Sequence, residues 1–144
     1  MFLTTKGRYA VMAVADLAIN WQKKPISLGE VASRQKIPLN YLEQIFIKLK
    51  SLKVVKSMRG PGGGYVLDQN SMSVTIREIM DAVEEDIKIT RCSKEHGCVE
   101  KTAKCIAHDI WDGLTLAIRS YLDTISIKDL RNKQMNNEND ISRP

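Results

Sequence analysis

In the first half of the chain, apolar residues recur at spacings of three and four, the period of an amphipathic helix. The first such stripe ends before Lys23-Lys24-Pro25. It is formed by Ala10, Val11, Val14, Leu17, Ala18 and Trp21. A second helix is expected from the capping box of Ser27 and Glu30 to about Arg34. A third begins near Pro38, because proline is tolerated in a first helical turn. Its apolar stripe is Leu42, Ile45, Phe46 and Leu49.

After Leu52 the periodicity changes from helical to extended. The runs Val54–Arg59 and Tyr65–Leu67 are β-prone and flank Gly60–Gly64, a pattern that predicts a hairpin. A second capping box, Thr75 to Glu78, begins a further helix. The apolar residues of that helix are Ile76, Ile79, Met80 and Val83. Residues 84–104 show no periodicity and predict an irregular loop.

A longer helix is predicted over about 105–124. Five of its apolar residues follow the 3, 4, 3, 4 spacing of a coiled-coil seam: Trp111, Leu114, Ile118, Tyr121 and Ile125. A second strip, Ile106, Ile110 and Ala117, lies beside this seam. A helix this apolar needs more cover than a small domain provides, so we expect a homodimer packed through it. The alternative is that the helix forms one face of a larger monomeric core.

The order of these elements predicts a mainly α-helical fold with a small β-hairpin wing. The expected domains are a winged helix-turn-helix over residues 1–83, a loop over 84–104, and a dimerisation helix with its end over 105–130. Residues 131–144 are rich in Asn, Asp, Glu and Gln, and we expect them to be a disordered tail.

Charge is distributed unevenly along the chain. The net charge is +5, but residues 1–80 hold 12 basic and 5 acidic side chains, a net of +7, and residues 81–144 hold 10 and 12, a net of −2. The basic half is therefore suited to a polyanion such as DNA. A solvated basic face without a partner is the alternative.

The third helix carries polar side chains opposite its apolar stripe. Amides can pair with adenine, a carboxylate with the cytosine amino group, and lysine with phosphate, so this face is suited to a major groove of double-stranded DNA. The candidate contacts are Asn40, Tyr41, Glu43, Gln44 and Lys48. Ile47 also lies on this outward side, where it either touches a thymine methyl group or packs on the hairpin. As a dimer, such a protein would bind a palindromic operator.

Arg59 and Gly60 stand at the hairpin tip, where a guanidinium can enter the adjacent minor groove. A phosphate-cradling loop at Gly60–Gly64 is a weaker interpretation, because no Gly-Lys-Ser/Thr follows. We find no Ser/His/Asp or paired-carboxylate arrangement that suggests an enzyme.

Three cysteines are an odd number, which argues against a disulfide framework. No apolar stretch approaches the ~20 residues of a membrane span. The apolar run Tyr9–Ile19 contains Asp16 and lacks a following cleavage site, so it is not interpreted as a signal peptide. We therefore expect the thiols to be reduced, in the cytoplasm.

The cysteines and one histidine form the pattern C-x5-C-x6-C-x2-H: Cys92, Cys98, Cys105 and His108. Cys105 and His108, three residues apart at the start of the expected helix, would share a face. Such a set suits either Zn²⁺ or a [2Fe–2S] cluster, and the absence of any metal is a third possibility. His96, within the loop, is a possible substitute ligand.

Several segments together resemble the IscR family of iron–sulfur cluster-binding winged helix-turn-helix transcription regulators. They are Leu3–Ala10, Tyr41–Gln44, the Arg-Gly-Pro-Gly-Gly-Gly-Tyr run at 59–65, and Thr90-Arg91-Cys92 with the Cys, Cys and His that follow. The resemblance extends to about residue 130.

This resemblance implies a homodimer that binds [2Fe–2S] through Cys92, Cys98, Cys105 and His108 and controls iron–sulfur assembly genes. It makes Tyr41, Glu43, Gln44 and Arg59 DNA contacts and the iron–sulfur assembly machinery the source of the cluster. The alternatives are a redox- or nitric-oxide-sensing relative of the same fold, a zinc-stabilised repressor, and an electron-transfer protein, which would have no use for a basic recognition helix.

Overall fold

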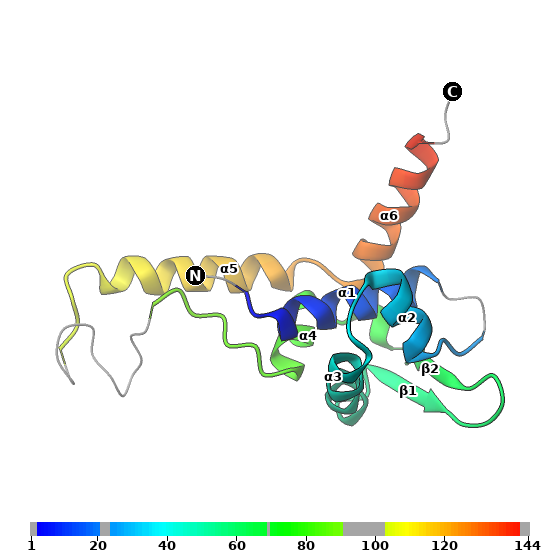
Figure 1. Cartoon of the computed structure of the whole chain (residues 1–144). Helices are drawn as coiled ribbons and strands as arrows, with labels where there is room; N and C mark the ends of the chain where they lie inside the picture. Colours follow the sequence, from blue (N-terminus) through cyan, green and yellow to red (C-terminus); the bar gives the residue numbers. More distant parts are fainter. Residues whose placement is uncertain (1–2, 21–23, 69, 91–102, 142–144) are drawn as a thin grey trace.

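The computed structural model describes residues 3–20, 24–68, 70–90 and 103–141. Its helices are α1 (Thr5–Ile19), α2 (Leu28–Gln35), α3 (Leu39–Ser51), the 3-10 helix η1 (Ser71–Ser73), α4 (Ile76–Ala82), α5 (His108–Asp123) and α6 (Ile127–Ile141). The strands β1 (Val55–Met58) and β2 (Gly64–Leu67) form an antiparallel hairpin in which Val55 faces Leu67 and Met58 faces Gly64. The prediction of a mainly helical winged helix-turn-helix is confirmed (Figure 1).

Helices α1 to α4 enclose one hydrophobic core. The apolar stripes predicted for α3 and α4 are buried throughout, and most of the α1 stripe is buried with them. Trp21, at the end of that stripe, lies outside the described residues. Phe46 and Leu42 of α3 are fully buried against Leu17 and Val14 of α1 in this core. Since each such side chain contributes about 1.5–3 kcal/mol on burial, this core fixes the orientation of α3.

The wing is anchored by a third segment that the sequence analysis did not predict. Ile26, just before α2, pairs with Tyr65 of β2: its N–H donates to the Tyr65 carbonyl at 2.9 Å, and the Tyr65 N–H donates back at 2.7 Å. The two backbones approach so closely that a Cβ on Gly64 would lie 2.4 Å from the Ile26 carbonyl oxygen. Glycine is therefore required at the base of the wing.

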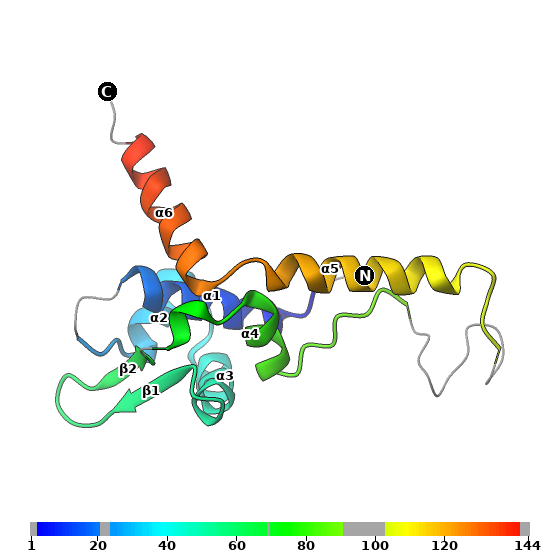
Figure 2. The same ribbon diagram turned by 180° about the vertical axis from the view of Figure 1, so that it is seen from behind.

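Helices α5 and α6 extend away from this domain in different directions (Figures 1 and 2). Between them, the chain returns to the domain and pairs with the start of α4. The Ile76 N–H donates to the Ile125 carbonyl at 2.9 Å, and the Ile127 N–H donates to the Val74 carbonyl at 3.0 Å. Ile125 was predicted to belong to the α5 seam, but it follows the helix and packs on the core of its own domain.

The predicted tail at 131–144 is wrong as far as the structure describes it, because α6 extends to Ile141. The helix begins at a capping box, in which the Ser126 N–H donates to Asp129 Oδ2 at 2.9 Å and the Asp129 N–H donates to Ser126 Oγ at 3.2 Å. Ile127 is fully buried and Leu130 packs beside it. A polar composition suggested disorder, but a cap and two apolar anchors initiate a helix.

None of the described helices is long and apolar enough to cross a membrane.

Candidate functional site

The predicted contacts of α3 lie on its outward face. Asn40, Tyr41, Glu43 and Gln44 are exposed, and Lys48 is partly exposed, while the opposite stripe is buried. Ile47 is 68% exposed, so it does not pack on the hairpin and remains available for an apolar contact. The helix thus presents amide, carboxylate, phenol and methyl groups side by side, the chemical types that distinguish base edges in a major groove.

A buried carboxylate joins α1 to α2, the first helix of the helix-turn-helix. Asp16 of α1 is fully buried and accepts from Arg34 Nε at 3.0 Å, from a terminal nitrogen of Arg34 at 2.7 Å, and from Gln35 Nε2 at 2.8 Å. The hydrogen bonds between Arg34 and Asp16 raise the pKa of Arg34. Sequence reasoning gave Asp16 no structural role, because its partners are 18 and 19 residues away.

Two aromatic contacts hold α3, one at its exposed polar face (the reading face) and one at its buried face. The Tyr41 ring meets Tyr9 of α1 edge-on, with centroids 5.9 Å apart. Phe46 meets Tyr65 of β2 in the same manner at 4.8 Å. Edge-to-face pairs add about 0.5–1.5 kcal/mol beyond area burial, so α3 and the wing are held in one orientation.

The wing tip presents Arg59 to solvent beyond the end of β1. Gly60 and Gly62 adopt φ of 104° and 72°, and a Cβ on Gly63 would lie 2.4 Å from the Met58 carbonyl oxygen. Only glycines allow this tight turn without strain. The run at 60–64 is therefore the turn of a hairpin, with Arg59 exposed beside it.

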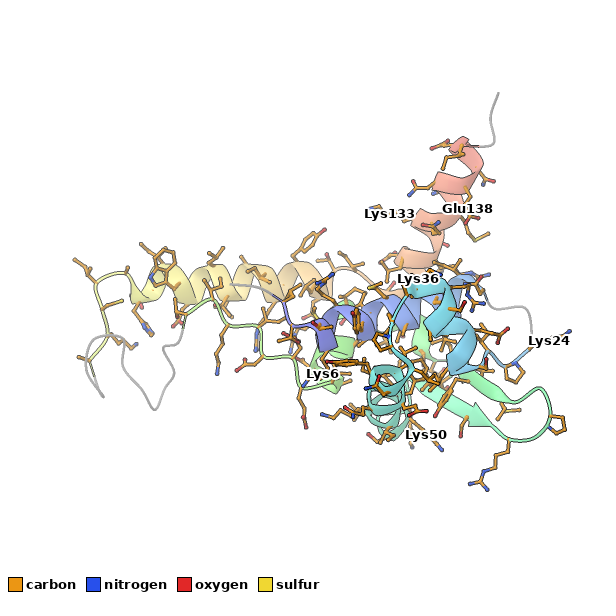
Figure 3. All side chains as sticks on the ribbon, in the orientation of Figure 1. Lys6, Lys24, Lys36, Lys50, Lys133 and Glu138 are labelled. Atoms are coloured by element: carbon orange, nitrogen blue, oxygen red, sulfur yellow. The ribbon has the colours of Figure 1, made fainter. Side chains whose placement is uncertain are left out.

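Two labelled lysines lie close to α3 in Figure 3: Lys6 of α1, and Lys50, which belongs to α3 itself. Lys48 is engaged within the protein, because its ammonium lies 2.6 Å from Glu84 Oε2. This hydrogen bond and the charge of Lys48 lower the pKa of Glu84. Neither Glu84 nor its neighbour Glu85 was picked out by the sequence pattern.

Two of the four candidate metal ligands lie within the described residues. Cys105 was expected on the helix, but α5 begins at His108, and Cys105 lies in the preceding turn, where its carbonyl accepts from the His108 N–H at 3.1 Å. Cys92 and Cys98, as well as the substitute ligand His96, lie outside the described residues, which contain no complete metal-ligand group.

His108 Nε2 lies 3.0 Å from Asp112 Oδ2. A carboxylate on one ring nitrogen is typical of metal-binding histidines, which the carboxylate orients. The Cys105 thiol and the oriented His108 imidazole are therefore suitable ligands for a soft metal centre.

The fold and the exposed reading face of α3 are those of a winged helix-turn-helix transcriptional regulator, a class of protein that binds DNA and is not an enzyme. The chain belongs to the Rrf2 family, described as iron-dependent transcriptional regulators, which it matches over residues 3–133.

Individual relatives agree with this assignment. The chain is 45% identical over 134 residues to a putative HTH-type transcriptional regulator of Haemophilus influenzae, covering 93% of this chain and 89% of the relative. It is 41% identical over 134 residues to the HTH-type transcriptional regulator IscR of Klebsiella pneumoniae, covering 93% and 82%. The solved structure of CymR, the global cysteine regulator of B. subtilis, has a TM-score of 0.76 at 27% identity, covering 92% of this chain and 98% of that one. The chain is thus an IscR-like member of a family that also includes a cysteine regulator, so the fold alone does not define the signal.

Proposed function

We propose that this regulator reads a palindromic operator with α3 in the major groove and the wing in the minor groove. Asn40, Glu43 and Gln44 would contact base edges, Tyr41 would flank them, and Arg59 with Gly60 would enter the minor groove. The exposed polar face of α3, held by Tyr9 and Tyr65, is the single observation that carries this proposal.

Glu43 provides a direct test of base reading. A carboxylate that faces the groove can accept a hydrogen bond from the cytosine amino group, and it repels phosphate. Its main effect is therefore to weaken binding to unsuitable DNA sequences. We expect Glu43→Ala to relax sequence choice more than it weakens binding, measured by selection from a random duplex pool. Equal loss on all sequences would contradict this role. Glu30→Ala, in the α2 cap, serves as a control that removes the same charge elsewhere.

We infer that the protein is a homodimer that pairs through α5. No residue of α5 is buried, and Trp111, Leu114 and Tyr121 are 38%, 42% and 64% exposed. These side chains repeat on one face, and burying them against a second copy would remove a large apolar surface from water. Ile118, the next residue of the seam, packs on the core of the domain, as does Ile125 beyond the end of the helix.

We further propose that Cys92, Cys98, Cys105 and His108 hold a [2Fe–2S] cluster, and that the regulator senses iron–sulfur status in the cytoplasm and controls iron–sulfur assembly genes. The assembly machinery would supply the cluster. Bound there, it would supply a redox-active group whose loss is the signal. Support comes from the likeness to IscR and from the Asp112–His108 pair. Zinc at the same residues, or a redox or nitric-oxide signal, are the alternatives.

The decisive experiment is anaerobic purification, with an absorption spectrum and assays for iron, sulfide and zinc, on the wild-type chain and on Cys92→Ala. We expect visible absorption bands with iron and sulfide in the wild type and their loss in the variant. A colourless wild-type protein containing zinc would establish the zinc alternative. A spectrum unchanged in Cys92→Ala would contradict the ligand assignment.

A further inference from the structure

Among the proposed DNA contacts that the structure describes, Lys48 is the one whose charge is held by a carboxylate. Its ammonium lies 2.6 Å from Glu84 Oε2, and the side chains of Lys48 and Glu84 are 37% and 75% exposed. Glu84 follows the end of α4, while Lys48 belongs to α3, so the pair joins two elements at the rim of the reading face. A lysine in this position would otherwise be free to contact phosphate.

The position of Glu84 is fixed by its neighbours. Its N–H donates to the Asp81 carbonyl at 3.0 Å, in the left-handed turn that ends α4. The next residue, Glu85, is buried, and its carboxylate accepts from the N–H groups of Thr4 at 3.0 Å and Gly7 at 3.1 Å and from the Thr4 hydroxyl. The first turn of α1 thereby holds this segment against the domain, and Glu84 with it.

The Glu85 side chain packs tightly against α1. A Cβ added to Gly7 would lie 2.6 Å from Glu85 Oε2, so the carboxylate is packed directly on the helix backbone. Negative charge at a helix N-terminus is also favoured by the helix dipole. The backbone of Glu84 is therefore held in a defined place beside α3.

The backbone turn at Glu84 does not by itself require an acidic residue. Lys36 and Lys53 adopt the same left-handed conformation in the turns that follow α2 and α3, and both are basic. Lys48 and, to a smaller extent, Lys6 lower the pKa of Glu84, so the carboxylate is ionised at neutral pH. A phosphate that approaches Lys48 must therefore displace the negatively charged Glu84 carboxylate or be repelled by it.

We propose that Glu84 withholds Lys48 from DNA phosphates and so lowers the affinity of this regulator for DNA of any sequence. Base contacts from Asn40 and Gln44 are unaffected. Because phosphate contacts carry no sequence information, operator and other DNA lose affinity by the same factor, and less of the regulator is held on non-operator DNA at a given concentration. The proposal rests on the proposed function in one respect, that α3 faces DNA.

The test compares Glu84→Gln with Asp86→Asn in the full chain, with a mixed-sequence duplex as the probe. Both substitutions remove one negative charge from the segment after α4. The partners of Asp86 are Lys88 and Arg119, which belong to that segment and to α5 rather than to α3. The measurement is the binding constant over a series of salt concentrations.

We expect Glu84→Gln to tighten binding about two- to fivefold at low salt and to steepen the plot of log Kobs against log salt by about 0.9 per bound chain. Asp86→Asn should leave the slope unchanged. Adding Lys48→Gln to Glu84→Gln should cancel both gains, because the released lysine is their source.

Three results would overturn the proposal. Glu84→Gln could match Asp86→Asn in affinity and slope, or its gain could persist when Lys48 is also changed. Glu84→Gln could also lower thermal stability without altering DNA binding, which would mean that the ion pair only stabilises the fold. A wild-type chain that fails to bind the duplex at every salt concentration would contradict the proposed function instead.

Discussion

The domain formed by α1 to α4 and the projecting helix α5 have similar amphipathic patterns but opposite outcomes. In the domain, Leu17 and Phe46 are almost wholly buried, because four helices face one another. In α5 no residue is buried, and Leu114 keeps 42% of its surface exposed. A periodic apolar stripe therefore indicates that a face will be covered but not what covers it. The domain carries its own cover, and we propose that α5 obtains it from a second copy.

The largest effect that tests this comparison lies in the domain core. We expect Phe46→Ala to lower the free energy of unfolding by about 3–5 kcal/mol, because it leaves a cavity among α1, α3 and β2. The neighbouring Ile47→Ala, on the exposed face, should change it by less than about 0.5 kcal/mol. Urea denaturation followed by circular dichroism measures both, and similar losses would mean that α3 is not oriented as described.

On α5, the same kind of contrast should be visible in association instead of folding. We expect Leu114→Glu to weaken dimerisation about 100-fold, because a charge would be buried in the seam. Leu116→Glu, on the opposite side of the helix at 64% exposure, should leave it nearly unchanged. Sedimentation equilibrium over a range of protein concentrations measures the dissociation constant. A monomeric wild type, or equal effects of the two variants, would rule out this seam.

The start of α5 should respond to loss of the carboxylate beside His108. We expect Asp112→Ala to lower the affinity for the metal centre about 10- to 100-fold, since a carboxylate partner orients a metal-binding histidine. Asp109→Ala, in the same first turns of the helix, is the matched control. Iron, sulfide and zinc are assayed after dialysis against a chelator. Equal metal retention in both variants would mean that Asp112 does not contribute to the metal site.

The smallest effect concerns α6 and its cap. Hydrogen bonds from Ser126 lower the pKa of Asp129, so its folded-state value lies below the unfolded one. The cap therefore stabilises α6 at neutral pH, and this contribution is lost as the pH falls below the ordinary aspartate value of about 3.9 and through the lowered one. We expect Asp129→Asn to reduce helicity slightly at neutral pH and to remove this acid-dependent loss, measured by circular dichroism. Asp140→Asn should do neither.

Local patterns predicted most of the domain because local forces decide it. Ser27 and Glu30 form the expected capping box, with the Ser27 N–H 2.8 Å from Glu30 Oε2. The hairpin follows from its glycines, and the outward face of α3 follows from helical periodicity. The Ser126–Asp129 cap was available from the same rules, yet the polar composition beyond Arg131 outweighed it in the prediction.

Long-range polar contacts could not be found in this way. Asp16 contacts Arg34 and Gln35 across 18 and 19 residues, and Glu85 reaches Gly7 across 78. No spacing rule connects such residues, because their proximity exists only after the helices have packed.

The sequence by itself determined which residues are buried, where the helices of the reading domain begin, and which side chains α3 offers to DNA. These properties depend on spacings within one or two helical turns. Only the tertiary structure decided that Asp16 joins α1 to α2, that Ile125 turns back into its own domain, and that Glu84 lies against Lys48. Each of these depends on chain segments that meet when the hydrophobic core forms, which local sequence does not encode.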